Sequence, residues 1–398
     1  MSPGPAGTLA DAEAEVAHDP QPVVPIVSVD DHVIEHPDVF VDRLPTALEE
    51  RGPNIVHTPE GHDVWMIDGV PHPSIGLNAV AGKDRRDYGL EPTAYADMRD
   101  GCYRVADRIA GMDVDGVHAQ LCFPSLPGFA GGTFFNLADK ELARACVSAW
   151  NDWAIDEWCA SMPGRQIPLS LLPFWDIDAT VAEADRMIAK GTRTFSFTEA
   201  PHALGLPSYH TEHWDPLLAR CNEAGVPLSI HFGSGGAPAV APEAPFTTAI
   251  ALFGLNSQMA TIDLVNTRLF QRFPNLKFAL SEGGIGWMPY ILERADYTWE
   301  RHRYYTGMED ARKPSEIFRD HIYGCFIADD AGLHNVERIG EDNIMFESDY
   351  PHSDSNWPHA RKMLAEALAH LPDDVCAKIA EGNARKLYDF PRPTSPAS

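Results

Sequence analysis

Short apolar segments alternate with amphipathic segments along most of this chain, and this alternation limits its fold more than any other feature. Eight apolar segments are typical of buried strands, at residues 25–30, 116–124, 167–175, 192–199, 226–232, 276–282, 322–328 and 343–348. Helical periodicity follows most of them, at residues 138–162, 179–190, 213–224, 247–272, 287–305, 357–371 and 373–388. Because strands that alternate with helices pair in parallel, eight of them predict an α/β fold, the closed (β/α)8 TIM barrel.

An open, doubly wound parallel sheet is the main alternative to the barrel. Such a sheet usually binds a nucleotide phosphate at a glycine-rich turn after its first strand. Here that turn begins Asp30-Asp31-His32, and the chain contains neither G-x-G-x-x-G nor a P-loop. The sequence therefore favours the barrel and gives no reason to expect a bound nucleotide.

Three segments lie outside the alternation. Residues 1–24 are rich in Ala, Pro, Gly and acidic residues and predict a disordered leader, and residues 391–398 predict a disordered tail. A polar stretch with many Gly and Pro residues, at about 45–110, predicts an excursion after the first strand, either a lid or an interface. The barrel domain is then expected to span residues 25–390.

The composition excludes some partners and indicates a compartment. A formal net charge of −27 argues against nucleic acid or an anionic membrane surface as a partner, because both attract a basic face. The seven cysteines are scattered without a Cys-x-x-Cys pair, which is typical of free thiols in a reducing compartment. We see no signal peptide and no apolar stretch approaching 18 residues, so we expect a cytoplasmic protein that does not span a membrane.

Acidic residues and histidines stand at the ends of several predicted strands. The candidate metal ligands are Asp30, His32, Glu199, His231, Glu282 and Asp349. In a barrel these strand ends meet at one rim, where the active site lies. One ion cannot use so many ligands, whereas two ions can if a carboxylate bridges them.

Each candidate ligand also has a plain structural interpretation. An Asp or His after a strand is often a cap or a turn residue, and Glu199, which precedes Ala-Pro, could be only a loop acid. His352, His210 and His213 lie near the rim in sequence and could contact substrate or support the ligands, although surface histidine is the default interpretation. The recurrence of such residues at several tips favours ligation.

Several motifs in this order resemble the amidohydrolase superfamily, in the branch that includes aminocarboxymuconate-semialdehyde decarboxylase. They are Asp30-x-His32, His231 after Val-Pro-Leu-Ser-Ile, Phe-Pro-Asn-Leu-Lys-Phe before Glu282, Ser-Asp349-Tyr-Pro-His, and the closing Gly382-Asn-Ala-Arg-Lys-Leu-Tyr. The resemblance covers about residues 25–390. It implies a (β/α)8 barrel with metal at the rim, and it matches Asp349 to an aspartate that binds metal and moves protons.

The chain departs from that family pattern in two places. Glu282 stands where members commonly have His, and strand four lacks the lysine that bridges two metals in many members, with Glu199 as its only nearby substitute. A site of two imidazoles and up to four carboxylates suits iron or manganese, with zinc as another option, and one or two ions per chain. Some relatives resemble di-iron enzymes, among them a thioesterase, and members often form homodimers.

These features lead first to a metal-dependent hydrolase that acts on an amide, ester, thioester or activated C–C bond of a small molecule. A metal-activated water would attack, with Asp349 and His231 as the catalytic residues. The first alternative is non-oxidative decarboxylation of an aromatic or unsaturated acid, for which Lys83, Arg85 and Arg86 could bind the anion. A di-iron, oxygen-activating enzyme and a barrel without catalytic function are the others.

Overall fold

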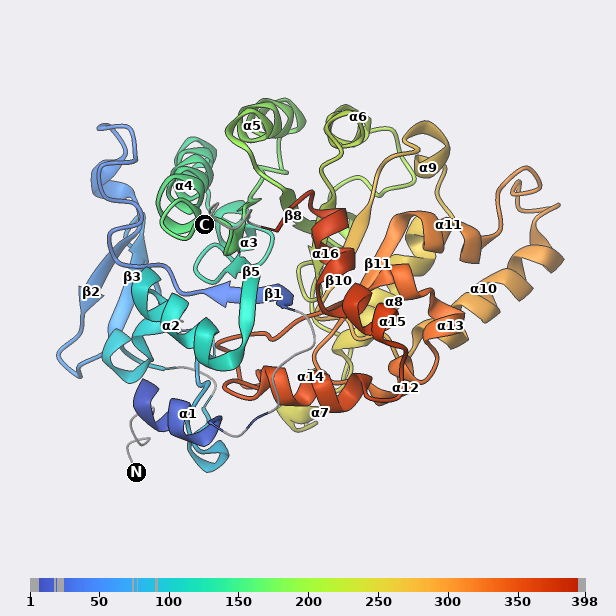
Figure 1. The fold of residues 1–398 in the computed structure, drawn as a ribbon. Helices are drawn as coiled ribbons and strands as arrows, with labels where there is room; N and C mark the ends of the chain where they lie inside the picture. Colours follow the sequence, from blue (N-terminus) through green and yellow to red (C-terminus); the bar gives the residue numbers. More distant parts are fainter. Residues whose placement is uncertain are drawn as a thin grey trace, which may run out of the picture.

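The computed structural model describes residues 7–17, 19, 25–73, 75–76, 78–89 and 92–392. A ring of parallel strands lies at its centre with helices outside (Figure 1). The strands are β1 (Ile26–Val33), β5 (Val117–Pro124), β6 (Gln166–Ile167), β7 (Leu169–Ser170), β8 (Thr194–Thr198), β9 (Leu228–His231), β10 (Phe278–Ser281), β11 (Ile322–Phe326) and β12 (Ile344–Phe346).

Backbone pairing closes these strands into a barrel. The pairs run β1–β5–β6 and β7–β8–β9–β10–β11–β12, and β6 and β7 are halves of one strand interrupted at Pro168, which has no N–H to donate. The ring closes just beyond β12, where the Asp349 amide donates to the Asp30 carbonyl at 2.8 Å and the His32 amide donates to the Tyr350 carbonyl at 2.7 Å. The predicted (β/α)8 barrel is confirmed.

The helices cover the outside of the ring. The longer ones are α2 (Val105–Asp115), α4 (Lys140–Trp153), α5 (Ile177–Lys190), α6 (Asp215–Ala224), α8 (Phe253–Val265), α10 (Met288–His302), α11 (Pro314–His321) and α14 (Ala360–Leu368). The shorter ones are α3 (Gly132–Phe135), α7 (Phe246–Ile250), α9 (Leu269–Arg272), α12 (Asp330–Leu333), α13 (Val336–Ile339), α15 (Asp373–Ala377) and α16 (Asn383–Leu387). Since helices screen the strands from water, β1, β5 and β8–β12 are almost wholly buried, as parallel strands usually are.

The predicted excursion carries a small antiparallel sheet of its own, β2 (Asn54–His57), β3 (Asp63–Ile67) and β4 (Val70–His72), beside the barrel in Figure 1. The segment after it reaches the rim. Asn78 Nδ2 donates to Ser353 Oγ at 2.7 Å, and the Ala81 amide donates to the Pro351 carbonyl at 3.0 Å. The excursion therefore supports the loop that follows Asp349.

The prediction of a disordered leader is wrong for residues 9–15, which form α1 (Leu9–Glu15). Thr8 and Asp11 make a capping box at its start, and Ala12 is 4% exposed because it packs into the core. An alanine- and glutamate-rich stretch becomes ordered here because it has a surface to pack against. Residues 1–6, 18 and 20–24 of the leader and most of the predicted tail, 393–398, lie outside the described residues.

One segment qualifies the expectation that nothing spans a membrane. Residues 246–265 are long and apolar enough to cross one, by length and composition alone. Core helices of soluble proteins pass the same test, and here the segment divides into α7 and α8, with α8 packed on α10 and α11. All seven cysteines are free, as predicted, and the cytoplasmic location stays a prediction.

Candidate metal centre

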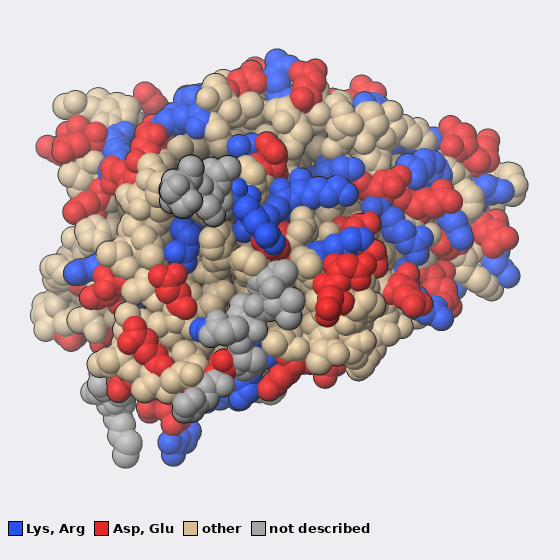
Figure 2. Space-filling model, in the orientation of Figure 1, with Lys and Arg blue, Asp and Glu red and all other residues tan. Residues whose placement is uncertain are grey.

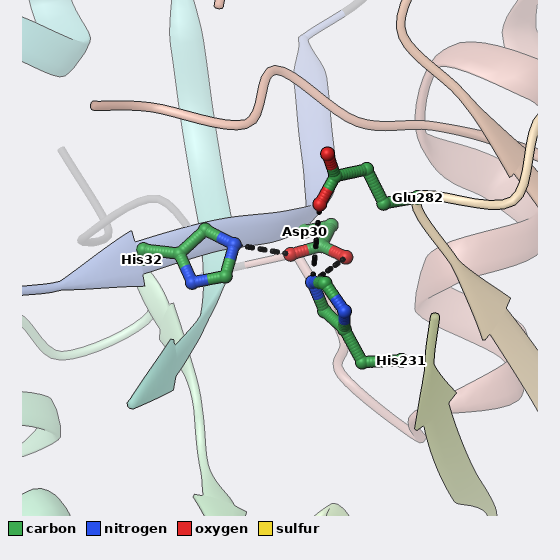
Figure 3. Close-up of side chains that lie close together, drawn as sticks. All are labelled: Asp30, His32, His231 and Glu282. Atoms are coloured by element: carbon green, nitrogen blue, oxygen red, sulfur yellow. Dashed lines mark ion pairs between the residues drawn. The ribbon is translucent and has the colours of Figure 1, made fainter. Parts of the chain in front are cut away.

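Five of the six predicted ligands come together at the carboxyl ends of the strands. Asp30 and His32 lie on β1, His231 ends β9, and Glu282 and Asp349 follow β10 and β12. One donor atom from each of Asp30, His32, His231 and Glu282 lies within 4.8 Å of the others (Figure 3), and Asp349 belongs to an overlapping group with His32, Glu282 and His352. The rim therefore contains one connected cluster of acids and imidazoles.

The spacing within the cluster suits ligands of a shared cation. His32 Nε2 lies 3.4 Å from Asp30 Oδ1 and 3.3 Å from Asp349 Oδ1, and His231 Nε2 lies 3.4 Å from Asp30 Oδ2 and 3.3 Å from Glu282 Oε2. These separations exceed ordinary hydrogen bonds. Both carboxylate oxygens of Asp30 and Oδ2 of Asp349 are buried without a hydrogen-bond partner. Such atoms are costly to bury unless a cation satisfies them, so these residues fit a divalent metal.

A backbone contact fixes which nitrogen of His231 faces the cluster. Nδ1 lies 2.8 Å from the Phe232 carbonyl, to which it can only donate, so Nε2 keeps its lone pair and points at Asp30 and Glu282 (Figure 3). Burial lowers the pKa of His231 to about 3 and holds the imidazole neutral. A neutral imidazole with a fixed tautomer is the form that binds metal.

The carboxylates of the cluster repel one another. Burial, and then the charges of Glu347, Glu282 and Asp349, raise the pKa of Asp30 well above its usual range. Burial and the charge of Asp349 do the same to the pKa of Glu282. Without a cation these acids favour their protonated forms, so a divalent ion would offset both the burial and the repulsion.

The backbone is strained at the two carboxylates that follow β10 and β12. Glu282 has φ 54° and Asp349 has φ 53°, in the left-handed region that residues other than glycine seldom occupy. Each such residue costs about 1–3 kcal/mol and persists only where surrounding contacts impose it. Here the Glu282 amide donates to Glu347 Oε2 at 3.0 Å, and the Asp349 amide donates to the Asp30 carbonyl. The strain turns both side chains into the barrel mouth.

His352 lies beside the cluster, as the sequence suggested. Its Nδ1 is 2.8 Å from Asp349 Oδ1, and its ring lies against that of His32 with 3.9 Å between centroids. The other two candidate histidines lie elsewhere. His210 pairs with Asp263 at 2.7 Å on the surface, and His213 packs edge-on against Trp214. Of the three, only His352 can exchange a proton with the centre.

The expectation that Glu199 binds metal does not agree with the structure. Its carboxylate accepts hydrogen bonds from Ser234 Oγ at 2.6 Å, Asn256 Nδ2 at 2.9 Å and the Gly235 amide at 3.2 Å, and it belongs to neither ligand group. Glu199 is buried, but the chain's own donors satisfy it. It ties the loop after β9 to α8.

This assignment makes Glu199→Gln a discriminating variant. We expect it to keep the metal content of the wild type, because none of the ligands is touched, while the free energy of unfolding falls by about 1–3 kcal/mol through the loss of buried hydrogen bonds. His231→Ala is the matched variant and should lower the metal content. Elemental analysis after dialysis measures the metal content of both variants. Loss of metal from Glu199→Gln would mean that Glu199 is a metal ligand.

The sequence did not identify the aromatic wall of the site. Phe129, in the loop after β5, stacks on His231 with 3.8 Å between centroids and an interplanar angle of 24°. Glu35 holds the start of this loop by accepting from the Leu126 amide at 2.7 Å and the Ser125 amide at 3.1 Å. No pattern in the sequence indicates that a phenylalanine in a Gly-rich loop faces a histidine about 100 residues later.

A cleft of about 380 Å³ opens beside this wall. Its lining includes Phe129, Phe174, His72 and the Gly233-Ser234 turn after His231. Two of the three cations of the excursion that could have bound an anion give no sign of such a role: Arg85 and Arg86 are exposed, and Arg86 pairs with Asp84. The cleft is partly aromatic, and Phe129 in its lining contacts His231 of the ligand cluster.

Comparisons with known proteins agree with this architecture. The family model described as Amidohydrolase matches residues 37–390, which confirms the resemblance inferred from the motifs. Curated protein sequences gave no match to the chain. Among solved structures, an amidohydrolase from Mycobacterium avium subsp. paratuberculosis K-10 is 22% identical with a TM-score of 0.70, covering 92% of this chain and 98% of its own.

Two other similar structures are described by their reactions. The 5-carboxyvanillate decarboxylase of Sphingomonas paucimobilis is 22% identical with a TM-score of 0.63, covering 92% of this chain and 98% of its own. The dihydroxybenzoic acid decarboxylase of Polaromonas sp. JS666, with bound manganese and the inhibitor 2-nitroresorcinol, is 17% identical with a TM-score of 0.59, covering 92% and 97%.

These comparisons correct the first functional expectation. Hydrolysis at a carbonyl is contradicted, because the reactions named for the similar structures are decarboxylations of aromatic acids. These reactions agree with the first alternative, non-oxidative decarboxylation of an aromatic or unsaturated acid. The expectation of a divalent metal is confirmed by the ligand cluster together with the manganese of the similar structures.

Proposed function

The chain belongs to the amidohydrolase family, and from that premise we propose that it is a metal-dependent decarboxylase of an aromatic carboxylic acid. The observation that carries the proposal is the position of Phe129, whose ring covers His231 at the edge of a cluster of metal ligands. A planar substrate in the cleft beside this ring would direct its carboxylate toward the metal ligands. The reactions named for the similar decarboxylases support the same substrate class.

The proposed reaction exchanges a carboxylate on an aromatic ring for a proton. The bond between the ring carbon and the carboxylate carbon breaks, its electron pair stays on the ring carbon, and carbon dioxide leaves. Asp30, His32, His231 and Glu282 would hold the ion, with Asp349 beside them next to His32 and Glu282. When bound, a divalent cation supplies a positive charge that orients and polarises the substrate oxygens.

We assign the delivery of the proton that replaces the carboxylate to Asp349 and His352. Nδ1 of His352 lies within hydrogen-bond distance of Asp349 Oδ1, and both side chains are buried. Asp349 would deliver the proton to the ring carbon, and His352 would return one to Asp349 for the next turnover. Phe129 would hold the ring in place and keep water from the reacting carbon.

The test is turnover of hydroxylated and methoxylated benzoic acids by the manganese-loaded protein in deuterated water. We expect carbon dioxide release without oxygen uptake and one deuterium at the vacated ring position, detected by mass spectrometry. Nitro analogues of the same acids should compete with substrate. Turnover only of esters or amides, or turnover that requires oxygen, would refute the proposal.

The aromatic wall gives a second, smaller prediction. Phe129→Leu removes the ring and should raise KM about 3- to 10-fold, because an aromatic pair contributes about 0.5–1.5 kcal/mol beyond its buried area. The conservative Phe129→Tyr keeps the ring and should keep KM within about twofold of the wild type. Steady-state kinetics measure both, and equal effects from the two variants would mean that the ring does not bind substrate.

A further inference from the structure

One acid at the barrel rim is buried and yet lies outside the metal cluster. Charged side chains are spread over the face drawn in Figure 2, where water solvates them. Asp31, in contrast, is 0% exposed, and it stands between Asp30 and His32 without belonging to either ligand group. A charge is costly to bury unless hydrogen bonds satisfy it, so the partners of Asp31 indicate its role.

The carboxylate of Asp31 contacts the segment that follows β12. Its Oδ1 accepts a hydrogen bond from Ser348 Oγ at 2.5 Å and another from the Tyr350 amide at 3.0 Å. These two donors belong to the residues immediately before and after Asp349. One oxygen of Asp31 therefore holds both neighbours of the residue to which the proposed function assigns proton delivery.

The main chain of β1 closes the barrel at this point without the Asp31 side chain. The Asp349 amide donates to the Asp30 carbonyl, and the His32 amide donates to the Tyr350 carbonyl. Any residue at position 31 would leave these two bonds in place, since main-chain atoms make them. What the carboxylate of Asp31 adds is a fixed geometry about Asp349.

Asp349 needs such support because its backbone is strained. Its φ of 53° lies in the left-handed region, which an aspartate leaves unless its surroundings hold it there. A negative φ would redirect the side chain, whose Oδ1 lies 3.3 Å from His32 Nε2 and 2.8 Å from His352 Nδ1. Two hydrogen bonds to one oxygen of Asp31, one on each side of the strained residue, oppose that relaxation.

From this geometry we propose that Asp31 is a positioning residue, which holds Asp349 in the orientation that proton delivery requires. The inference rests on the proposed function and extends it to a side chain outside both ligand groups. Arg108 of α2 supports the same segment, since its guanidinium lies 4.5 Å from the centroid of the Tyr350 ring and donates to the His32 carbonyl. A buried acid and a buried cation therefore both hold the turn around Asp349.

Replacing Asp31 tests this role through the kinetics of carbon dioxide release by the manganese-loaded protein. Asp31→Ala should lower kcat about 10- to 100-fold and leave KM and the metal content within about twofold of the wild type, because a displaced donor slows proton delivery without changing the ligands. Asp31→Asn keeps an oxygen in place of Oδ1 and should restore kcat to within about threefold. The control, Glu183→Ala, removes a buried acid that pairs with Asn151 and Arg186 on the outer helices, and it should leave kcat unchanged.

A double variant tests whether Asp31 acts through Asp349. If it does, Asp31→Ala should cause no further loss of kcat in the Asp349→Asn protein, since the group that it positions is already gone. Losses that multiply would overturn the proposal. Ser348→Ala removes only one of the two hydrogen bonds and should lower kcat about 3- to 10-fold, so it replaces Asp31→Ala if that variant does not fold. An unchanged kcat in these variants would equally contradict the proposal.

Crystal structures give a readout that does not depend on turnover. In manganese-loaded Asp31→Ala we expect φ of Asp349 to leave the left-handed region and the separation of its Oδ1 from His352 Nδ1 to become longer than a hydrogen bond, whereas Asp31→Asn should keep both. If no benzoic acid is turned over, the proposed function fails, but the structures still decide whether Asp31 positions Asp349. An Asp349 that keeps its place in Asp31→Ala would overturn the inference whatever the reaction.

Discussion

Replacing Asp349 with asparagine is expected to reduce turnover by about 10³-fold while the protein keeps its fold and most of its metal. The amide preserves the shape of the side chain and one oxygen that faces His32, but it can neither deliver a proton to carbon nor take one from His352, whose Nδ1 lies 2.8 Å from Oδ1. Rates of carbon dioxide release, with elemental analysis of the same preparation, measure the effect.

Asp354 supplies the matched control for this variant. It is an exposed acid five residues further along the same loop, and its charge helps to raise the pKa of Asp349. Asp354→Asn should change turnover by less than about threefold, since it removes charge without removing the proton donor. If Asp349→Asn retains near-native turnover, the proton comes from another residue, and His352→Gln becomes the variant to examine.

The strand tips could be predicted because two simple patterns coincide. In a barrel of strands that alternate with helices, the carboxyl ends of all strands lie at one rim. A polar residue at the end of each apolar segment is therefore expected at that rim. Asp30, His32, His231, Glu282 and Asp349 follow that rule, and the structure brings all five together. No contact between distant segments had to be guessed.

Glu199 satisfies the same rule and still does not reach the cluster. Glu199 also follows a buried strand, β8. Its carboxylate, however, accepts hydrogen bonds from Asn256 of α8 and from Ser234 of the loop after β9. These donors are 57 and 35 residues away, and nothing in the local sequence identifies them as its partners. The helix α1 was missed for a similar reason, since it depends on a packing surface formed by later segments.

The type of reaction could not be predicted from the ligands. Two imidazoles with several carboxylates can activate water or hold a substrate carboxylate, so the same residues are compatible with hydrolysis and with decarboxylation. The reactions named for the similar structures separate the two, and the sequence alone does not indicate them. The contact between Phe129 and His231 joins a loop to a strand end, and the sequence carries no sign of it either.

Removing the metal is expected to destabilise the protein, and increasingly so as the pH rises. A bound ion stabilises the folded state by about 4 kcal/mol at a free concentration about 1000 times its Kd. In the metal-free protein, burial and mutual repulsion raise the pKa values of Asp30, Glu282 and Asp349 well above their usual range. The folded metal-free state therefore binds more protons than the unfolded state.

Between about pH 7 and pH 9, the sign of the pH dependence of stability follows from the number of protons that the folded and the unfolded metal-free protein bind. In this window the unfolded carboxylates are ionised, and the histidines are neutral in both states, because burial lowers the pKa values of His32 and His231. Protons are then released on unfolding of the metal-free protein, so its stability falls as the pH rises. With metal the carboxylates that bind it, Asp30 and Glu282, are already ionised, so most of this loss disappears and the melting temperatures with and without metal should diverge.

Other buried acids do not obscure this difference. Burial raises the pKa values of Glu35 and Asp115 to about 7, but neither residue belongs to the ligand groups, so each titrates alike with and without metal. Thermal melts of chelator-treated and manganese-loaded protein across the window measure the divergence. His231→Ala should show little gain from manganese. If the two wild-type curves run parallel at every pH, the ionised acids are not what holds the cation.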